Sequence, residues 1–550
     1  MSIVFNPKNW LYFSCLLLLL CTNVYATSPE TKSPPVESKI DRQSIQGEIY
    51  AHFSELTYAT WAPDLNWNRL RDIYKNSDWQ PKWLQNGKPG EKARLLRDAI
   101  LNAHEHALLS EEYHAKALRY LWSARRNISL ARLDMLITDA FLRYSVEVRA
   151  GYQYPRAVDP QWYMAPSPVK PLKLMQAYLD AENSETFLSE LPPAHEGYKQ
   201  LQQAMLSYQT LLETRGEWQP LPDGPLLKLG SWGYDVLLLR MRLLHEGYTL
   251  DREPADEYLL DRDLDQQIRL FQKRYGHQID GIVGKRTRKS LNVTLHERIT
   301  QIQQNMERWR WLPHELGSRY VMVNMAGYRL QYIENNKTAL SMRVIIGKPF
   351  RATPAFRNDI KYLVVNPVWN IPPRIARDDL LPKIKEDSAF LKTNNIQVFE
   401  SWSKKAAMLN PDEIDWQAMQ QDDFKFKLAQ APGKTNSLGR IKFMFPNSFR
   451  VYLHDTPSRK LFNQRVRTFS SGCIRVERPI SLAQAMLKDN QQWSKKALRQ
   501  SIREGETLKI DLKQQVPIYL LYWTAWTDDQ GVHFRDDIYQ RNQQIISLES

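Results

Sequence analysis

Apolar residues recur with helical spacing through the first part of the chain, from about residue 90 to residue 215. In one stretch the spacing places six of them on a single helix face: Leu133, Leu136, Ile137, Ala140, Phe141 and Tyr144. Two later stretches repeat the pattern: Leu172, Met175 and Leu179, then Leu201, Met205, Tyr208 and Leu212. The pattern predicts a helical scaffold domain over 46–220 without visible chemistry.

A shorter unit of helical pattern covers 221–295. Its first two predicted helices present these apolar positions: Val236, Leu239, Leu243, Leu264, Ile268 and Phe271. A glycine turn over 280–284 then leads into a third short helix that ends near Leu291. We expect a compact three-helix domain, either a binding module or a packing unit alone, followed by a linker helix over 296–318.

From residue 319 the pattern changes to short runs rich in β-branched and aromatic residues, separated by turn signals. Eight runs predict strands: Tyr320–Met325, Arg329–Ile333, Leu340–Ile346, Lys361–Val365, Ile441–Phe445, Val451–His454, Gly472–Val476 and Thr507–Leu512. They indicate a β-rich domain over 319–550. Because 550 residues are too many for one core, the chain is expected to be a multidomain α+β protein.

The strand pattern lapses over 367–435, which is longer than an ordinary loop. Ile375, Leu380, Leu381 and Ile384 favour short helices there. We interpret this segment as a lid or cap inserted in the β-rich domain. The alternative is an inserted segment that packs against the domain and has no function of its own.

The N-terminus has the form of a secretory signal. Lys8 is the only charged residue in 1–26, an apolar run spans 11–21, and Val24-Tyr25-Ala26 offers small residues to a signal peptidase. The prediction is a signal peptide over 1–26, a Pro/Ser-rich flexible tether over 27–45, and a periplasmic mature protein. An uncleaved membrane anchor is the alternative.

Cysteine use changes once the signal is removed. Cys15 and Cys21 leave with it, so Cys473 is the only thiol of the predicted mature chain. A single thiol in an oxidising compartment makes no internal disulfide and suggests a reactive group. It is also too few ligands for a structural zinc site, so no metal or cofactor is expected. The net charge of +14 favours anionic partners, but no nucleic-acid-binding motif accompanies it.

The predicted strands bring a histidine near this thiol. His454 ends one strand and Cys473 begins another nineteen residues later. A thiol attacks a carbonyl as the thiolate and so needs a nearby base or cation. Gly472 allows close backbone approach to a substrate, its N–H could face an oxyanion, and Arg475 shares the strand face of Cys473. A buried, inert cysteine is the alternative.

The run Ser471-Gly472-Cys473-Ile474-Arg475-Val476, preceded by a strand-ending histidine, resembles the catalytic motif of the YkuD-type L,D-transpeptidases. The Asp-Gly-Ile-Val-Gly-Lys-Arg-Thr string at 280–287 resembles the peptidoglycan-binding domain of wall enzymes. Flanking segments also agree, among them 366–372, 436–440 and 443–447. Together they resemble the large periplasmic, YcbB-like members of the family.

The resemblance implies roles for individual residues. Cys473 would be the nucleophile and His454 its general base. Arg475, Tyr452 and Trp369 would shape the site, with Ser471 and Gly472 near the oxyanion. Two positions depart from the usual motif: Asp455 replaces a glycine after the histidine, and Ser471 replaces a histidine before Gly472.

The implied activity is the formation of 3→3 peptidoglycan cross-links through a cysteine thioester, with release of D-Ala from tetrapeptide stems. The implied partners are stem peptides, glycan strands and, as candidates, other wall-synthesis enzymes; carbapenems would be inhibitors. An L,D-carboxypeptidase or hydrolase acting on the same stems is one alternative. A non-catalytic peptidoglycan-binding scaffold, with Cys473 incidental, is the other.

Overall fold

The computed structural model describes residues 41, 43–54, 61–62, 64–249, 252–543 and 545. The predicted signal peptide, its cleavage site and most of the predicted tether lie outside these residues. Within the described part, no helix combines the length and apolarity that crossing a bilayer requires.

The scaffold region is helical, as its hydrophobic pattern predicts. Its main helices are α1 (Ile45–Ser54), α2 (Trp67–Lys75), α3 (Glu91–Leu101), α4 (Ala115–Leu121), α5 (Asn127–Ala150), α6 (Pro155–Val158), α7 (Pro171–Asp180), α8 (Ser184–Ser189) and α9 (Glu196–Arg215), with a short hairpin of β1 (Leu84–Gln85) and β2 (Lys88–Pro89). Helix α5 lies at the centre, and all six of its predicted core positions are buried. Its buried Asp134 accepts hydrogen bonds from Tyr74 Oη (2.6 Å) and from the Trp83 backbone N–H (2.8 Å).

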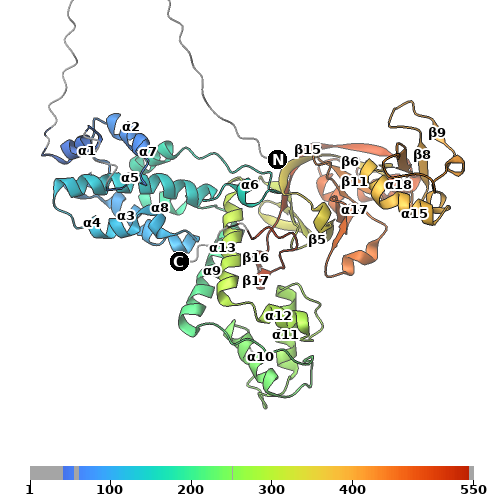
Figure 1. Ribbon diagram of the computed structural model, residues 1–550, viewed down its shortest axis with the longest axis horizontal. Coiled ribbons are helices and arrows are strands. Elements are labelled where there is room, and N and C mark those ends of the chain that lie inside the picture. Colours follow the sequence, from blue (N-terminus) through green and yellow to red (C-terminus); the bar gives the residue numbers. More distant parts are fainter. Residues whose placement is uncertain are drawn as a thin grey trace, which may run out of the picture.

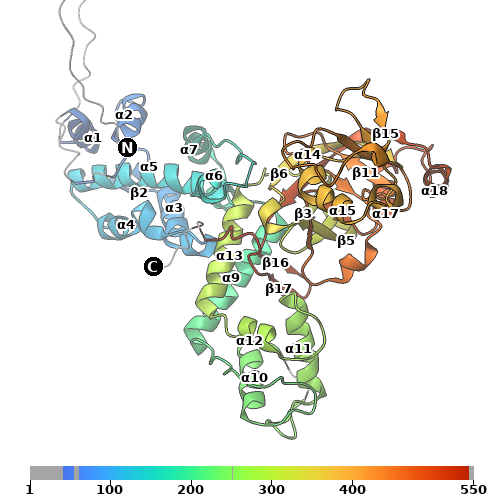
Figure 2. The ribbon, with the colours of Figure 1, turned by 45° about the vertical axis from the view of Figure 1, so that its right-hand side comes forward.

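The predicted three-helix unit consists of α10 (Tyr234–His245), α11 (Arg262–Arg274) and α12 (Lys285–Leu291). The turn before α12 needs a glycine, because Gly281 has a φ of +73° and a Cβ there would lie 2.0 Å from Asp265 Oδ1. The unit projects from the rest of the molecule beside the hairpin of β16 (Ala525–Asp528) and β17 (Gly531–Phe534) (Figures 1 and 2). Tyr275 stacks on Phe534 with the ring centroids 5.4 Å apart.

Helix α13 (Leu295–Arg310) occupies the predicted linker. It is more than a linker, because it is largely buried between α9 and the C-terminal segment. Asn305 bonds to both the N–H and the hydroxyl of Thr524, and Arg308 donates to the Arg541 carbonyl oxygen. The sequence pattern missed this burial because polar side chains make many of the contacts.

The β-rich region contains a nine-stranded sheet that closes on itself through the pairing of β4 with β5. Its order is β13-β5-β14-β12-β11-β6-β15-β3-β4. The bounds are β3 (Arg319–Asn324), β4 (Arg329–Glu334), β5 (Lys337–Gly347), β6 (Phe356–Val365), β11 (Ile441–Met444), β12 (Leu453–His454), β13 (Thr468–Ser470), β14 (Ile474–Val476) and β15 (Leu508–Leu521). Every predicted run falls on a strand, although β6 and β15 are longer than predicted. The sequence analysis missed β13 and the hairpin β16–β17. Helices α17 (Pro479–Met486) and α18 (Lys495–Glu504) follow β14.

The segment 367–435 contains the predicted short helices, but it also has a sheet of its own, which the prediction lacked. The order of that sheet is β7 (Trp369–Asn370), β10 (Lys427–Gln430), β8 (Ile396–Phe399) and β9 (Met408–Leu409). The helical turns are α14 (Pro373–Ile375), η5 (Ala376–Leu380), α15 (Leu381–Glu386) and α16 (Phe390–Thr393). Its buried residues form a separate small core.

Asn436 fixes the base of this insert. The side chain is fully buried and donates to the carbonyl oxygens of Pro367 (3.0 Å) and Ala431 (2.9 Å), while its oxygen accepts from the Leu438 N–H (2.8 Å). One amide therefore ties together the two ends of a seventy-residue excursion, and the insert is anchored where it leaves the main sheet.

A buried ion pair in α13 offers a test of its role in the core. Glu307 contacts Arg310 at 2.8 Å, and neither side chain is exposed. Glu307 also accepts from the Trp311 indole N–H and the Gln153 backbone N–H, both at 3.0 Å. Glu307→Ala should lower the free energy of unfolding by about 3–5 kcal/mol, because it leaves the Arg310 charge buried without its acidic partner. Denaturant unfolding followed by tryptophan fluorescence measures this change.

The matched control is Glu111→Ala. Glu111 pairs with Arg119 at 3.4 Å with both side chains more than half exposed. An exposed pair of this kind is worth about 0–1 kcal/mol. Equal effects of the two substitutions would mean that α13 is not part of the core that unfolds in the measured transition.

Candidate active site

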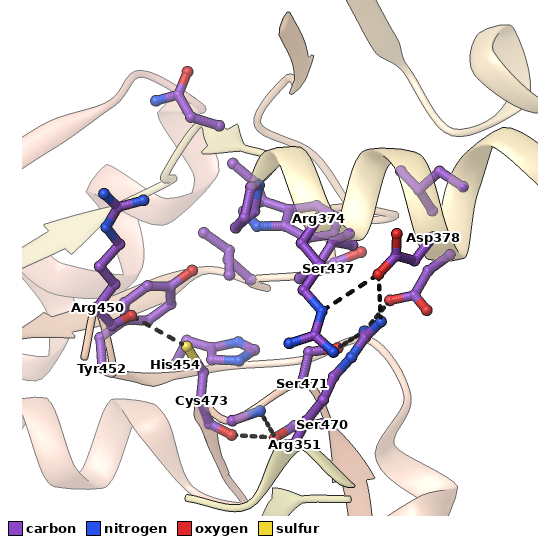
Figure 3. A pocket seen from close by; sticks show the side chains of 18 of the residues that line it. Arg351, Arg374, Asp378, Ser437, Arg450, Tyr452, His454, Ser470, Ser471 and Cys473 are labelled. Atoms are coloured by element: carbon purple, nitrogen blue, oxygen red, sulfur yellow. Dashed lines mark hydrogen bonds and ion pairs between the residues drawn. The ribbon is translucent and has the colours of Figure 1, made fainter. Parts of the chain in front are cut away.

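A cavity of about 1360 Å³ lies between the insert and the main sheet. All seven site residues singled out in the sequence line it: Trp369, Tyr452, His454, Ser471, Gly472, Cys473 and Arg475. Figure 3 shows Cys473, His454 and Tyr452 grouped on one side, with Arg351, Arg374 and Asp378 on the other. The fold thus brings together residues from the main sheet and from the insert.

Cys473 sits in a tight turn immediately before β14. Gly472 has a φ of +115°, a conformation that favours glycine, and its carbonyl oxygen accepts a hydrogen bond from Thr353 Oγ1 at 2.8 Å. Ser470 Oγ donates to the Cys473 carbonyl oxygen and accepts from the Gly472 N–H at 3.1 Å. The turn is therefore held by Ser470, which is adjacent to it in sequence, and by Thr353, which comes from a separate segment.

These contacts correct one expectation about the oxyanion, that the Gly472 N–H faces it. The Gly472 N–H donates to Ser470 and does not face the cavity as a free donor. Ser471 is exposed, and its hydroxyl accepts from Arg351 Nη1 at 2.9 Å. Ser471 therefore joins the nucleophile turn to Arg351.

Strand pairing places the histidine beside the thiol. Strands β12 and β14 are parallel neighbours, with Leu453 opposite Ile474 and His454 opposite Arg475. His454 is 5% exposed. No hydrogen bond joins it to Cys473, whose Sγ lies 3.7 Å from the Arg450 carbonyl oxygen. A small rotation of the thiol would be needed before the proton could pass to the imidazole.

The orientation of His454 comes from the backbone. Its Nδ1 lies 2.6 Å from the Asp455 carbonyl oxygen. A carbonyl only accepts, so Nδ1 carries the proton and Nε2 is the basic nitrogen. The side chain of Asp455, at a position where the motif usually has glycine, accepts from the N–H groups of Arg440 (2.8 Å) and Thr456 (2.7 Å). It thereby holds the chain that presents the carbonyl.

Tyr452 connects the nucleophile with the insert. Burial raises the pKa of its hydroxyl most strongly, Cys473 raises it further, and the side chain of Trp369 lowers it. Its ring meets that of His454 edge-on at 5.7 Å, and Lys442 Nζ lies 3.9 Å above the same ring. A change at Trp369 therefore reaches the thiol through one side chain.

The electrostatics favour neutral groups in the resting site. Burial, followed by the positive charge of Arg475, lowers the pKa of His454 to about 3. Burial raises the pKa of the Cys473 thiol, although hydrogen bonds from Tyr452 and the charges of Lys442 and Arg475 act in the opposite direction. Burial lowers the pKa of Lys442. The expected activation by Arg475 is present, but burial outweighs it.

An ionic cluster joins the insert to the nucleophile turn. Arg351 pairs with Asp379 and, at 3.5 Å, with Asp378. Arg374 pairs with the same Asp378 at 3.3 Å (Figure 3). Because Arg351 also donates to Ser471, η5 of the insert is connected to the residue two before Cys473.

Sequence reasoning missed four residues of the site: Thr353, Ser470, Arg351 and Lys442. Thr353 and Ser470 have no role in the sequence analysis, because their hydrogen bonds depend on the turn geometry. Arg351 and Lys442 come from separate strands or turns, and no local pattern marks them. Among the described residues, no three His, Cys, Asp or Glu side chains gather as a set of metal ligands.

Three family models match the chain. A "Scaffold domain" matches 68–205, a "Putative peptidoglycan binding domain" matches 233–291, and the YkuD "L,D-transpeptidase catalytic domain" matches 318–499. The last match contains the main-sheet strands β3 to β14, the insert, and the Cys473 turn. The match over 233–291 covers α10, α11 and α12.

A Haemophilus influenzae protein named "Putative L,D-transpeptidase" is 34% identical over 259 residues, 47% of this chain and 50% of that protein. The chain thus spans half the length of this curated relative. A crystal structure of an L,D-transpeptidase from Xylanimonas cellulosilytica is 15% identical, with a TM-score of 0.17 over 55% of this chain and 100% of that one. One from Stackebrandtia nassauensis is 14% identical, with a TM-score of 0.20 over 55% and 97%. Scores this low support no inference.

The Cys473 thiol should ionise at a higher pH than an ordinary thiol. Because burial raises the pKa of Cys473, alkylation by iodoacetamide should be slow at neutral pH and should rise with pH to a midpoint above the ordinary thiol range. His454, with a pKa of about 3, stays neutral from about pH 5 upward and should add no inflection there. Intact-mass measurement of alkylation against pH checks both. A midpoint near pH 6 would contradict this picture and indicate a preformed thiolate.

The insert should matter more to a large substrate than to a small reagent. Trp369→Ala removes the side chain that reaches Tyr452 and lines the cavity. We expect about a tenfold loss of turnover on stem peptides, with alkylation of Cys473 by iodoacetamide changed much less, because misplacement penalises an oriented reaction. Met408→Ala, at a 63% exposed position in β9, is the control and should change neither rate. Equal losses in both assays of Trp369→Ala would assign the residue a purely structural role.

Proposed function

Because residues 318–499 are an L,D-transpeptidase catalytic domain of the YkuD type, we propose that this protein forms 3→3 cross-links in peptidoglycan through a thioester on Cys473. The observation that carries the proposal is the placement of Cys473, in the turn before β14, beside His454 on the parallel neighbour β12, with the Nδ1 of His454 engaged by the backbone. This arrangement leaves Nε2 as the base for the only cysteine among the described residues.

The first half-reaction acylates the enzyme. Cys473 Sγ attacks the carbonyl carbon of diaminopimelate in a tetrapeptide stem, and His454 Nε2 takes the thiol proton. The Cys473 N–H and the Tyr452 hydroxyl would donate to the developing oxyanion, since the Gly472 N–H is engaged by Ser470. The C–N bond then breaks, and the imidazolium gives its proton to the departing D-alanine amine.

The second half-reaction transfers the acyl group. The side-chain amine of diaminopimelate in another stem attacks the thioester, and His454 Nε2 accepts its proton. The C–S bond breaks, and Cys473 regains a proton from the imidazolium. The insert and the sheet both line the cavity where this occurs, and a second stem bound there would place its amine, rather than water, beside the thioester.

The rest of the chain supports a wall substrate. The domain matched over 233–291 would hold the enzyme on peptidoglycan, and the N-terminal apolar run would direct it to the periplasm. The basic net charge of +14 suits an anionic polymer. Other wall-synthesis enzymes are candidate partners in the same proposal.

Incubation with purified muropeptides tests the reaction. Wild type should convert tetrapeptide stems into 3→3 dimers and free D-Ala, read by mass spectrometry. Cys473→Ala should form no dimer, and His454→Ala should slow acylation by about 10²–10⁴-fold, the usual worth of a positioned base. A carbapenem should add once to wild type and not to Cys473→Ala.

The products separate the alternatives. Tripeptide stems without dimers would assign an L,D-carboxypeptidase. Dimers made by Cys473→Ala would contradict the role of the thiol. Unchanged stems, together with retention on sacculi, would indicate a non-catalytic binding protein.

A further inference from the structure

Three neighbouring strands place Lys442, His454 and Arg475 in one row. Lys442 on β11 pairs with His454 on β12, and His454 pairs with Arg475 on β14. Residues directly opposite across paired strands project from the same face of a sheet. The base therefore lies between two cationic side chains, and all three line the cavity.

Neither flanking cation has an acidic partner among the described residues. Lys442 Nζ contacts the Tyr452 ring at 3.9 Å, and Arg475 Nε is buried without a hydrogen-bond partner. Two other arginines of the cavity differ, since Arg351 and Arg374 are paired with Asp378 or Asp379. Two partly buried and unpaired cations are costly unless a ligand supplies the missing negative charge.

The chemistry of the leaving group indicates where a negative charge on the substrate must lie. In the proposed reaction, His454 Nε2 gives its proton to the departing amine, so that amine must reach the imidazole. In a C-terminal amino acid the carboxylate carbon is bonded to the Cα that carries this amine. Once the amine is at His454, the carboxylate therefore lies within side-chain reach of the residues on either side of it.

We propose that Lys442 and Arg475 form a carboxylate site for the expelled residue, so that the enzyme selects donor stems whose scissile bond is followed by a single residue with a free C-terminal carboxylate. This inference rests on the proposed function and adds Lys442 as a specificity-determining residue. A carboxylate on the part of the stem that stays bound to the enzyme is not attached to the Cα of the departing amine. Its position is therefore not fixed beside His454.

Binding at this site would also assist the base. Arg475 and Lys442 both disfavour the protonated form of His454. A carboxylate placed between them offsets these charges at the moment when the imidazole must accept the thiol proton. Substrate lacking the carboxylate leaves both cations uncompensated, so the penalty should appear in acylation.

The experiment compares two donors in wild type, Lys442→Met and Lys442→Arg. One donor is the tetrapeptide stem and the other is the same stem with its terminal carboxylate converted to a carboxamide. Release of D-Ala or its amide gives kcat/KM for each. Wild type should prefer the carboxylate by about 10–100-fold, typical of a charge-assisted hydrogen bond. Lys442→Met should reduce this ratio to a few-fold by slowing only the carboxylate donor, and Lys442→Arg should retain most of it.

Lys509→Met is the matched control. Lys509 Nζ lies 4.7 Å above the Tyr362 ring on the same sheet, but outside the cavity, and it pairs with Asp511 at 2.7 Å. The preference of the Lys509→Met variant for the carboxylate donor should equal that of wild type. If Lys442→Met slows both donors equally, Lys442 acts on the thiol or the fold, and the carboxylate site is wrong. Equal use of both donors by wild type would also overturn it.

Binding to Cys473→Ala separates this inference from the proposed reaction. Calorimetry should show tighter binding of the tetrapeptide than of its carboxamide, and Lys442→Met in the same background should remove the difference. If wild type releases neither product, the proposed function fails, and the binding difference alone then supports or rejects the site. Equal binding of the two peptides in that case rejects it.

Discussion

The parallel pairing of β12 with β14 is the constraint on which the site depends. It fixes His454 beside Arg475 and next to the turn that carries Cys473. These strands are separated by a loop and the short strand β13, so the register is set by the core residues Leu453 and Ile474 rather than by a tight turn. A slip of one residue would send the imidazole to the opposite face, where it could not act on the thiol.

The surroundings of Cys473 and His454 lower the reactivity of the thiol in the resting site. Burial keeps the thiol and imidazole neutral, while Tyr452, Lys442 and Arg475 stand ready to stabilise negative charge. A buried, neutral thiol of this kind reacts slowly with electrophiles that do not bind in the site. In the proposed reaction it would gain its activity when a substrate brings the complementary charge and excludes water, which is a form of preorganisation.

The insert and the main sheet are coupled through side chains and not through a shared core. The insert has its own apolar cluster, and its links to the nucleophile are polar: Trp369 to Tyr452, and Asp378 and Asp379 to Arg351. The Cys473 turn does not depend on these links alone, because Ser470 and Thr353 hold it independently.

The sequence by itself determined the helical stripes, the strand-rich region and the candidate site residues, because local periodicity, a single cysteine beyond the N-terminal apolar run and a short motif are all written along the chain. It did not determine that α13 is buried, that the insert forms a sheet, that Gly472 donates to Ser470, or that Lys442 stands beside His454. Only the tertiary structure decided these, since each depends on strands or turns that meet in space at a register no local pattern specifies. The carbonyl that orients His454 belongs to the next residue, Asp455, yet only the folded backbone turns it toward the ring.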